Sequence, residues 1–62
     1  MKEIINILIR RDGISENEAC NLVEDCMIEV EEAITAGKYT EAEDIFMRYL
    51  QLEPDYLIYL LA

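Results

Sequence analysis

Apolar residues recur every three to four positions along most of the chain, which is the spacing of an amphipathic helix. The pattern is clearest over residues 16–36, where one face is apolar and the opposite face carries carboxylates. The apolar positions of that helix are Ala19, Leu22, Val23, Cys26, Met27, Val30, Ala33 and Ile34. The same spacing predicts helices over residues 2–11 and 41–52, and a short C-terminal helix or turn over 54–61. The sequence therefore predicts an all-α bundle of three main helices, forming a single domain over residues 1–62.

Two predicted helix starts have the S/T-x-x-E spacing of a capping box, Ser15 with Glu18 and Thr40 with Glu43. In this motif the hydroxyl accepts a hydrogen bond from the amide three residues later, and the Glu side chain binds the amide of the cap. Each box follows a glycine that can end the preceding helix in a left-handed turn. The second connection is short, so we expect an antiparallel helical hairpin there, with Tyr39 at the edge of its core.

Fourteen acids and five bases give the chain a net charge of −9, and no Lys or Arg occurs between Asp12 and Glu32. Such a chain is repelled by phosphate, which argues against direct binding to nucleic acid or to an anionic membrane. The simplest interpretation of the carboxylates is a solvated face that keeps the protein soluble. They also permit a basic protein partner, and we expect its acidic binding face to consist of Asp25, Glu29 and Glu32.

Hydrophobic residues make up 53% of the 62 positions, which is high for so short a chain. A domain of this size buries only about 60% of the surface of its unfolded chain, so apolar residues are left over for a partner. The helix over residues 2–11 is apolar around most of its circumference, and the C-terminal segment is rich in Leu and Tyr. We therefore expect either a marginally stable monomer or a homodimer. The candidate apolar interface consists of Ile5, Ile9, Tyr56 and Tyr59.

Residue types suited to catalysis or metal binding are scarce. The chain has no His, and Cys20 and Cys26 would lie about 9 Å apart along a straight helix. That separation excludes a disulfide, which needs Cα atoms within roughly 7 Å, and two thiols alone make a poor zinc site. We expect both to be buried free thiols, as in a reducing cytoplasm. The sequence therefore predicts no enzyme activity, no cofactor and no metal.

The apolar run at residues 4–9 is the only segment that resembles a targeting or membrane-spanning sequence. Asn6 interrupts it, and it is too short for a secretory signal or a membrane span. We therefore expect a cytoplasmic protein.

Residues 33–54 resemble the second half of a tetratricopeptide repeat, with Ala42, Phe46 and Pro54 at its characteristic positions. The first half departs from that pattern, because the places of its Trp, its Leu and its small residue are taken by Cys26, Glu29 and Val30. A single repeat also cannot bury its own core. We interpret the segment as a helical hairpin rather than as part of a solenoid.

A second resemblance covers nearly the whole chain and depends on several segments that occur in a fixed order. The segments are Met1-Lys2-Glu3-Ile4-Ile5-Asn6, Arg10-Arg11-Asp12-Gly13, Glu18-Ala19, Gly37-x-Tyr39-x-Glu41-Ala42-Glu43-Asp44 and Leu52-Glu53-Pro54-Asp55-Tyr56-Leu57. In them the chain resembles a group of small uncharacterised proteins of Gram-positive bacteria and their phages. The resemblance implies a cytoplasmic helical protein, and it brings no known activity and no functional residues.

The expected function is protein–protein interaction, as a small regulatory or accessory protein of bacterial or mobile-element origin. The alternative is a mimic of DNA that uses its carboxylates to occupy the groove of a basic nucleic-acid-binding protein. Salt separates the two interpretations. Binding by a mimic weakens steeply as charges are screened over roughly 8–10 Å, whereas an apolar interface hardly responds.

Overall fold

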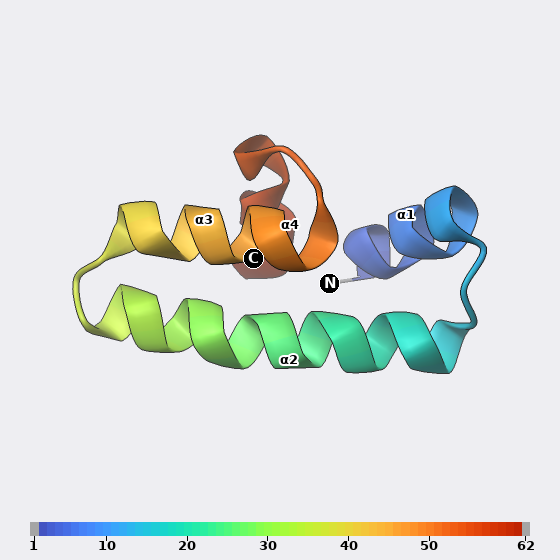
Figure 1. Cartoon of the computed structure of the whole chain (residues 1–62), viewed down its shortest axis with the longest axis horizontal. Helices are drawn as coiled ribbons and strands as arrows, with labels where there is room; N and C mark the ends of the chain where they lie inside the picture. Colours follow the sequence, from blue (N-terminus) through green and yellow to red (C-terminus); the bar gives the residue numbers. More distant parts are fainter. Residues whose placement is uncertain (1, 62) are drawn as a thin grey trace.

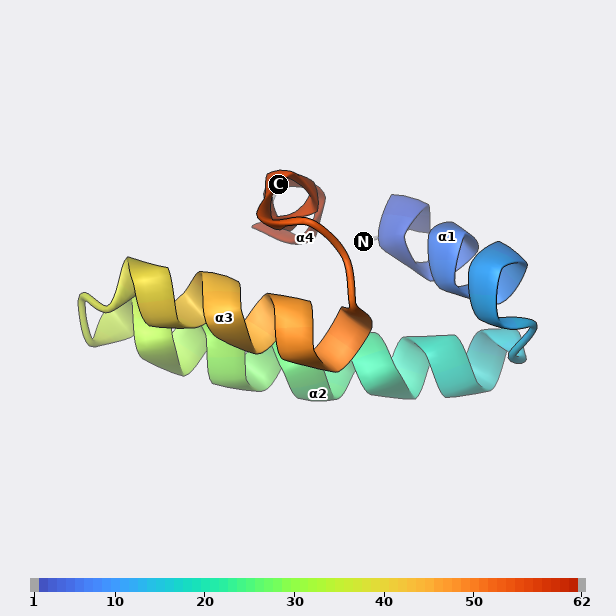
Figure 2. The same ribbon diagram turned by 45° about the horizontal axis from the view of Figure 1, so that its top comes forward.

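Helix α2 (Glu16–Thr35) is the longest element of the computed structural model, which describes residues 2–61 (Figure 1). Helix α1 (Lys2–Asp12) lies along the first half of α2, and α3 (Tyr39–Leu50) lies along its second half on the same side (Figures 1 and 2). Helix α3 runs antiparallel to α2, whereas α1 is inclined to α2 (Figure 2). The two helices therefore cover different halves of the same side of α2.

After α3 the chain turns back through a 3-10 turn, η1 (Pro54–Tyr56), into the short helix α4 (Leu57–Leu61). Figures 1 and 2 show α4 on the same side of α2 as α1 and α3, and in Figure 2 it lies farther from α2 than α3 does. Over residues 2–61 the fold is all-α, with three main helices and a short C-terminal one, as the sequence predicts. The two end residues of the predicted domain, Met1 and Ala62, lie outside the described residues.

The buried residues of the four helices form one hydrophobic cluster, and within residues 2–61 every buried side chain is apolar. Its members are Ile4, Leu8, Ala19, Val23, Cys26, Val30, Ala33, Ala42, Ile45, Phe46, Leu50, Leu57 and Leu60. The predicted apolar face of α2 points into this cluster, with Leu22, Met27 and Ile34 partly buried at its edge. Burial of Leu57 and Leu60 holds α4 on the bundle, so the short C-terminal helix is part of the same core.

The first capping box is confirmed in part, because Ser15 caps α2 through its side chain and Glu18 contacts the Ser15 hydroxyl. The amide of Glu18 donates a hydrogen bond to Ser15 Oγ at 3.1 Å, and the Ser15 hydroxyl lies 3.2 Å from the Glu18 carboxylate, to which it donates. The far end of α2 closes as expected with Gly37 at a φ of 77°. There the amides of Gly37 and Lys38 bind the carbonyls of Ile34 and Ala33, which is a Schellman motif.

The prediction of a second capping box at Thr40 is wrong. Helix α3 begins at Tyr39, its N-cap is Lys38, and Lys38 makes no side-chain capping bond. The reason lies in the preceding turn, because the Schellman motif leads the chain directly into a new helix. The amide of Ala42 already donates to the Lys38 carbonyl at 3.1 Å, so Thr40 falls inside the first turn of α3 instead of capping it.

Ser15→Ala is expected to lower the free energy of unfolding by about 1 kcal/mol, because it removes the side-chain acceptor of the Glu18 amide. Thr40→Ala is the matched control, and it should change the same quantity by less than about 0.5 kcal/mol because Thr40 is an exposed residue within α3. Urea unfolding followed by circular dichroism measures both. Equal losses would contradict the different roles that the structure gives to the two hydroxyls.

Helix α3 ends at Leu50, two residues earlier than predicted, because Gln51 adopts a left-handed conformation with a φ of 54°. The last carbonyls of a helix lack partners within it. Here the Arg11 guanidinium donates to the carbonyl of Leu50 at 2.7 Å and to that of Gln51 at 2.9 Å. Arg11 Nε also donates to Asp12 Oδ1 at 2.8 Å, and this contact lowers the pKa of the Asp12 carboxyl below its ordinary value. One side chain thus ties the end of α1 to the end of α3.

Candidate protein-binding surfaces

The carboxylates of Asp25, Glu29 and Glu32 are all exposed on α2. Glu24 and Glu31 are exposed too, but each precedes one of these residues by a single position and so lies about 100° around the helix. Helix α2 contains no Lys or Arg. It therefore presents two separate acidic sides, neither of which is neutralised within the helix. We call the side formed by Asp25, Glu29 and Glu32 the acidic face.

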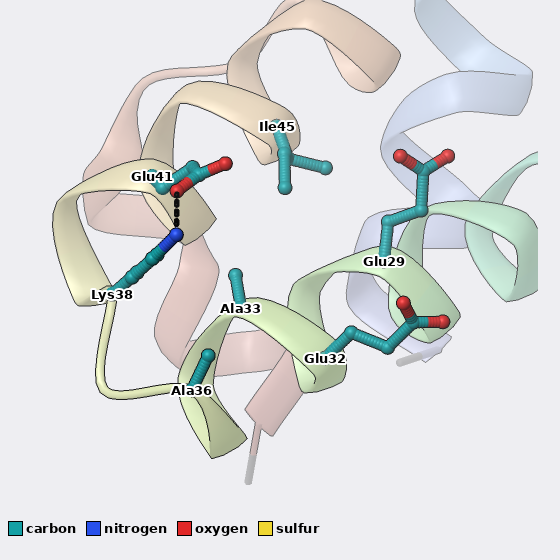
Figure 3. A pocket seen from close by; sticks show the side chains of 7 residues that line it. All are labelled: Glu29, Glu32, Ala33, Ala36, Lys38, Glu41 and Ile45. Carbon is teal, nitrogen blue, oxygen red and sulfur yellow. Dashed lines mark ion pairs between the residues drawn. The ribbon is translucent and has the colours of Figure 1, made fainter.

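A hollow lies beside the acidic face, where α2 turns into α3 (Figure 3). Its lining residues are Glu29, Glu32, Ala33, Ala36, Lys38, Glu41 and Ile45. Figure 3 shows Glu29 and Glu32 on one side of Ala33 and Glu41 on the other. Ala33 and Ile45 are only 8% and 7% exposed, so they form an apolar floor beneath the carboxylates. We call this place the hairpin hollow.

Glu29 is held in position by α3. The hydroxyl of Tyr49, a half-buried residue of α3, donates a hydrogen bond to Glu29 Oε2. This hydrogen bond, followed by burial and by the charges of Glu29 and Asp25, raises the pKa of Tyr49 above its ordinary value. Tyr49 therefore remains a protonated donor at neutral pH.

The cation nearest to the hairpin hollow is Lys38, whose Nζ lies 3.9 Å from Glu41 Oε2. Both side chains are exposed, and an ion pair of this kind contributes little because water screens it. The rim therefore carries three carboxylates against one loosely held ammonium group. An incoming cation would meet an excess of negative charge above the floor of Ala33 and Ile45.

The fold divides the four residues of the predicted apolar interface. Ile5 and Ile9 are half-buried and pack against the core. Tyr56 is half-buried and Tyr59 is 45% exposed, and their ring centroids lie 6.0 Å apart. The segment also exposes two apolar residues that sequence reasoning missed, and with them it forms the C-terminal apolar surface: Tyr56, Ile58, Tyr59 and Leu61. Their signal was the i, i+3 spacing of the inward-facing Leu57 and Leu60, which leaves the intervening positions outside.

The expectation that Tyr39 lies at a core edge is wrong, since its side chain is 54% exposed. Tyr39 is the first residue of α3, at the end of the hairpin where no further helix covers it (Figure 1). Ile28, at 59% exposed, interrupts the polar side of α2. Neither residue lines the hairpin hollow.

The two cysteines differ in burial. Cys26 is fully buried, as predicted, and burial followed by the charge of Glu29 raises its pKa to about 11. It is therefore a protonated thiol at neutral pH and a poor nucleophile. Cys20 is half-buried, so the expectation of burial is only partly met, and both thiols are free. Among residues 2–61 no group of three His, Cys, Asp or Glu side chains is arranged to hold a metal ion.

Comparisons with protein-family models, with curated proteins and with solved structures found no match to this chain. Within the described residues no helix combines the length and the apolar character that crossing a membrane requires.

Proposed function

We propose that the protein is a small protein-binding module whose hairpin hollow receives a basic side chain from a partner protein. The observation that carries this proposal is the arrangement of three rim carboxylates, Glu29, Glu32 and Glu41, around an apolar floor. A mostly acidic patch without a floor would favour any cation equally. A hollow with both features favours a cation that brings an aliphatic stem.

Lys and Arg are such residues, because they lay an apolar stem along a surface while the charged head stays near water or a counter-charge. In the hairpin hollow the stem would contact Ala33, Ala36 and Ile45, and the head would lie among the rim carboxylates. Glu29 is already oriented by Tyr49, so less side-chain freedom is lost when the cation binds. Asp25 lies one turn before Glu29 on the acidic face and would attract a second basic residue of the same partner.

This function is non-enzymatic, and it suits a cytoplasmic regulatory or accessory protein of bacterial or phage origin. The net charge of −9 would speed association with a basic protein through long-range attraction. Contacts at the hairpin hollow would then decide which basic segment stays bound. The overall negative charge thus attracts the basic partner, and the hairpin hollow determines which segment of that partner stays bound.

The test compares two double variants that each remove two charges from α2. Glu29→Gln with Glu32→Gln neutralises the hairpin hollow, and Glu24→Gln with Glu31→Gln neutralises the other acidic side. The probe is a synthetic amphipathic helical peptide with lysines on its polar face, followed by fluorescence anisotropy at about 150 mM salt. We expect the first pair to weaken binding by roughly 10-fold and the second by less than about 3-fold.

Ala36→Arg provides an independent check, because it places a guanidinium of the chain's own beside the hollow at an exposed helix end. It should weaken peptide binding about as much as the first double variant does, while leaving the thermal midpoint nearly unchanged. Equal losses from the two double variants would contradict a local site and favour a DNA mimic, in which all the carboxylates contribute. Unchanged binding in the Ala36→Arg variant would also count against the hollow.

A further inference from the structure

A hollow lies on the C-terminal part of the fold, where η1 passes into α4. Its lining residues are Glu53, Asp55, Tyr56, Ile58 and Tyr59. We call this place the tyrosine hollow. Among the described residues it shares no lining side chain with the hairpin hollow, so the two places can be altered separately.

Aromatic and aliphatic side chains form one part of the tyrosine hollow. The ring centroids of Tyr56 and Tyr59 lie 6.0 Å apart, and the ring planes are inclined by 39°. Tyr56 is half-buried, Tyr59 is 45% exposed, and the neighbouring Ile58 is 66% exposed. The face of an aromatic ring is electronegative and attracts a cation within about 6 Å of the ring centre. This apolar wall therefore favours a positively charged ligand over a neutral one.

The charged side chains of the tyrosine hollow are both carboxylates. Glu53 is the N-cap of η1 but makes no side-chain capping bond, and Asp55 lies in the first turn. Within residues 2–61 neither carboxylate forms an ion pair or a side-chain hydrogen bond. Residues 49–61 contain no Lys or Arg, so this stretch of the chain supplies no cation of its own. The two carboxylates are therefore available to a positively charged ligand.

Rings and carboxylates together select among ligand classes. The carboxylates repel an anion, and a hard metal ion needs more oxygen ligands than two side chains supply. An ammonium group is strongly hydrated and holds its water in so open a place. A guanidinium is more weakly hydrated, stacks on aromatic rings and pairs with carboxylates, so it can use both parts of the hollow.

We propose that the tyrosine hollow binds the guanidinium of an arginine side chain of a protein partner. The planar head lies against the tyrosine rings, and its donors point to the carboxylates of Glu53 and Asp55. The methylene stem lies along Ile58. This site does not rest on the hairpin hollow, because different elements form the two places.

The test is a 1H–15N NMR titration with Nα-acetyl-arginine amide up to about 50 mM, at constant ionic strength. The amide shifts of residues 53–59 are expected to saturate with a Kd of roughly 10 mM. Nα-acetyl-citrulline amide has nearly the same shape but no charge, and it should give no saturable shifts there. Nα-acetyl-lysine amide should bind at least 2-fold more weakly, because its ammonium group is more strongly hydrated.

Two variants remove the two parts of the tyrosine hollow separately. Asp55→Asn removes a carboxylate and Tyr59→Leu removes a ring, both at exposed positions. Each should weaken binding of the arginine compound at least 3-fold. Circular dichroism confirms that both variants keep the wild-type helix content. Tyr39→Leu, at an exposed tyrosine outside the hollow, is the matched control and should bind as the wild type does.

The double variant Glu29→Gln with Glu32→Gln separates this site from the hairpin hollow, and it should leave the shifts of residues 53–59 unchanged. Loss of those shifts in the double variant would overturn an independent site. The proposal is also overturned if the arginine compound gives no saturable shifts over residues 53–59. Equal binding of the citrulline or the lysine compound, or wild-type affinity in Asp55→Asn or Tyr59→Leu, would overturn it as well.

Discussion

Phe46→Ala is expected to leave most of the protein unfolded at room temperature. Phe46 is the largest fully buried side chain, and it lies on α3 within the hydrophobic cluster. Truncating a buried Phe costs about 3–5 kcal/mol, which includes the cavity that it leaves. A single core in a chain of this length rarely supplies more than about 3–5 kcal/mol in total, so the loss is comparable to the whole stability.

The measurement is the helical circular dichroism signal at 25 °C, taken in dilute solution so that self-association does not contribute. Tyr39→Ala is the control, because Tyr39 is an aromatic residue of the same helix but is 54% exposed. It should cost less than about 1 kcal/mol and leave the signal intact. A Phe46→Ala variant that unfolds with the wild-type midpoint would contradict the position of Phe46 at the centre of the core.

Arg11→Ala is expected to lower the free energy of unfolding by about 2 kcal/mol, an unusually large effect for a surface residue. The guanidinium binds the carbonyls of Leu50 and Gln51, 39 and 40 residues away in sequence. Hydrogen bonds that involve a charged group contribute about 1.5–3 kcal/mol each when shielded, and partial exposure of Arg11 reduces this. Loss of Arg11 also leaves the carbonyl end of α3 without this partner, beside the left-handed Gln51.

Arg10→Ala is the matched control, because it removes a cation from the same last turn of α1, and the hydrogen bond of Arg10 within residues 2–61 stays inside α1, from Nε to the Asn6 carbonyl. It should cost less than about 0.5 kcal/mol. Arg11→Lys keeps the charge but loses the fork of donors, so it should fall between wild type and Arg11→Ala. Urea unfolding midpoints measure all three. Equal effects of Arg10→Ala and Arg11→Ala would mean that only the helix dipole is involved.

The helices were predictable because their signals are local. The apolar face of α2 follows from spacing alone, and the Ser15 cap needs only the residues from Ser15 to Glu18. The Thr40 box failed because its turn is determined by backbone hydrogen bonds around Gly37, which carry the chain into α3 before Thr40 is reached. Two capping boxes with the same sequence spacing therefore had different outcomes, because Ser15 caps a helix and Thr40 does not.

Long-range contacts were beyond the reach of the sequence. Nothing near Arg11 in the sequence indicates that its guanidinium meets the carbonyls of Leu50 and Gln51. The placement of α4 likewise decides which apolar residues are left over. It leaves Ile5 and Ile9 packed against the core and turns Ile58 outward.

The sequence predicted the residues that α2 contributes to the candidate site, but not those that α3 contributes. Asp25, Glu29 and Glu32 share a side of α2 because of their spacing, and the structure shows all three exposed. The other half of the hairpin hollow comes from α3, where Glu41 and Ile45 approach α2 only once the Gly37 turn has formed. The short glycine connection between two amphipathic helices was the signal, but it does not give the relative rotation of the two helices.

The proposed function requires that the hairpin hollow, rather than the whole acidic surface, binds a basic segment. A 1H–15N NMR titration of the protein with the lysine-bearing helical peptide tests this requirement residue by residue. We expect the amide shifts to concentrate at the end of α2 and the start of α3, over Glu29, Glu32, Ala36, Lys38 and Glu41. Shifts spread evenly along α2, with Glu24 and Glu31 moving as far as Glu29 and Glu32, would contradict it.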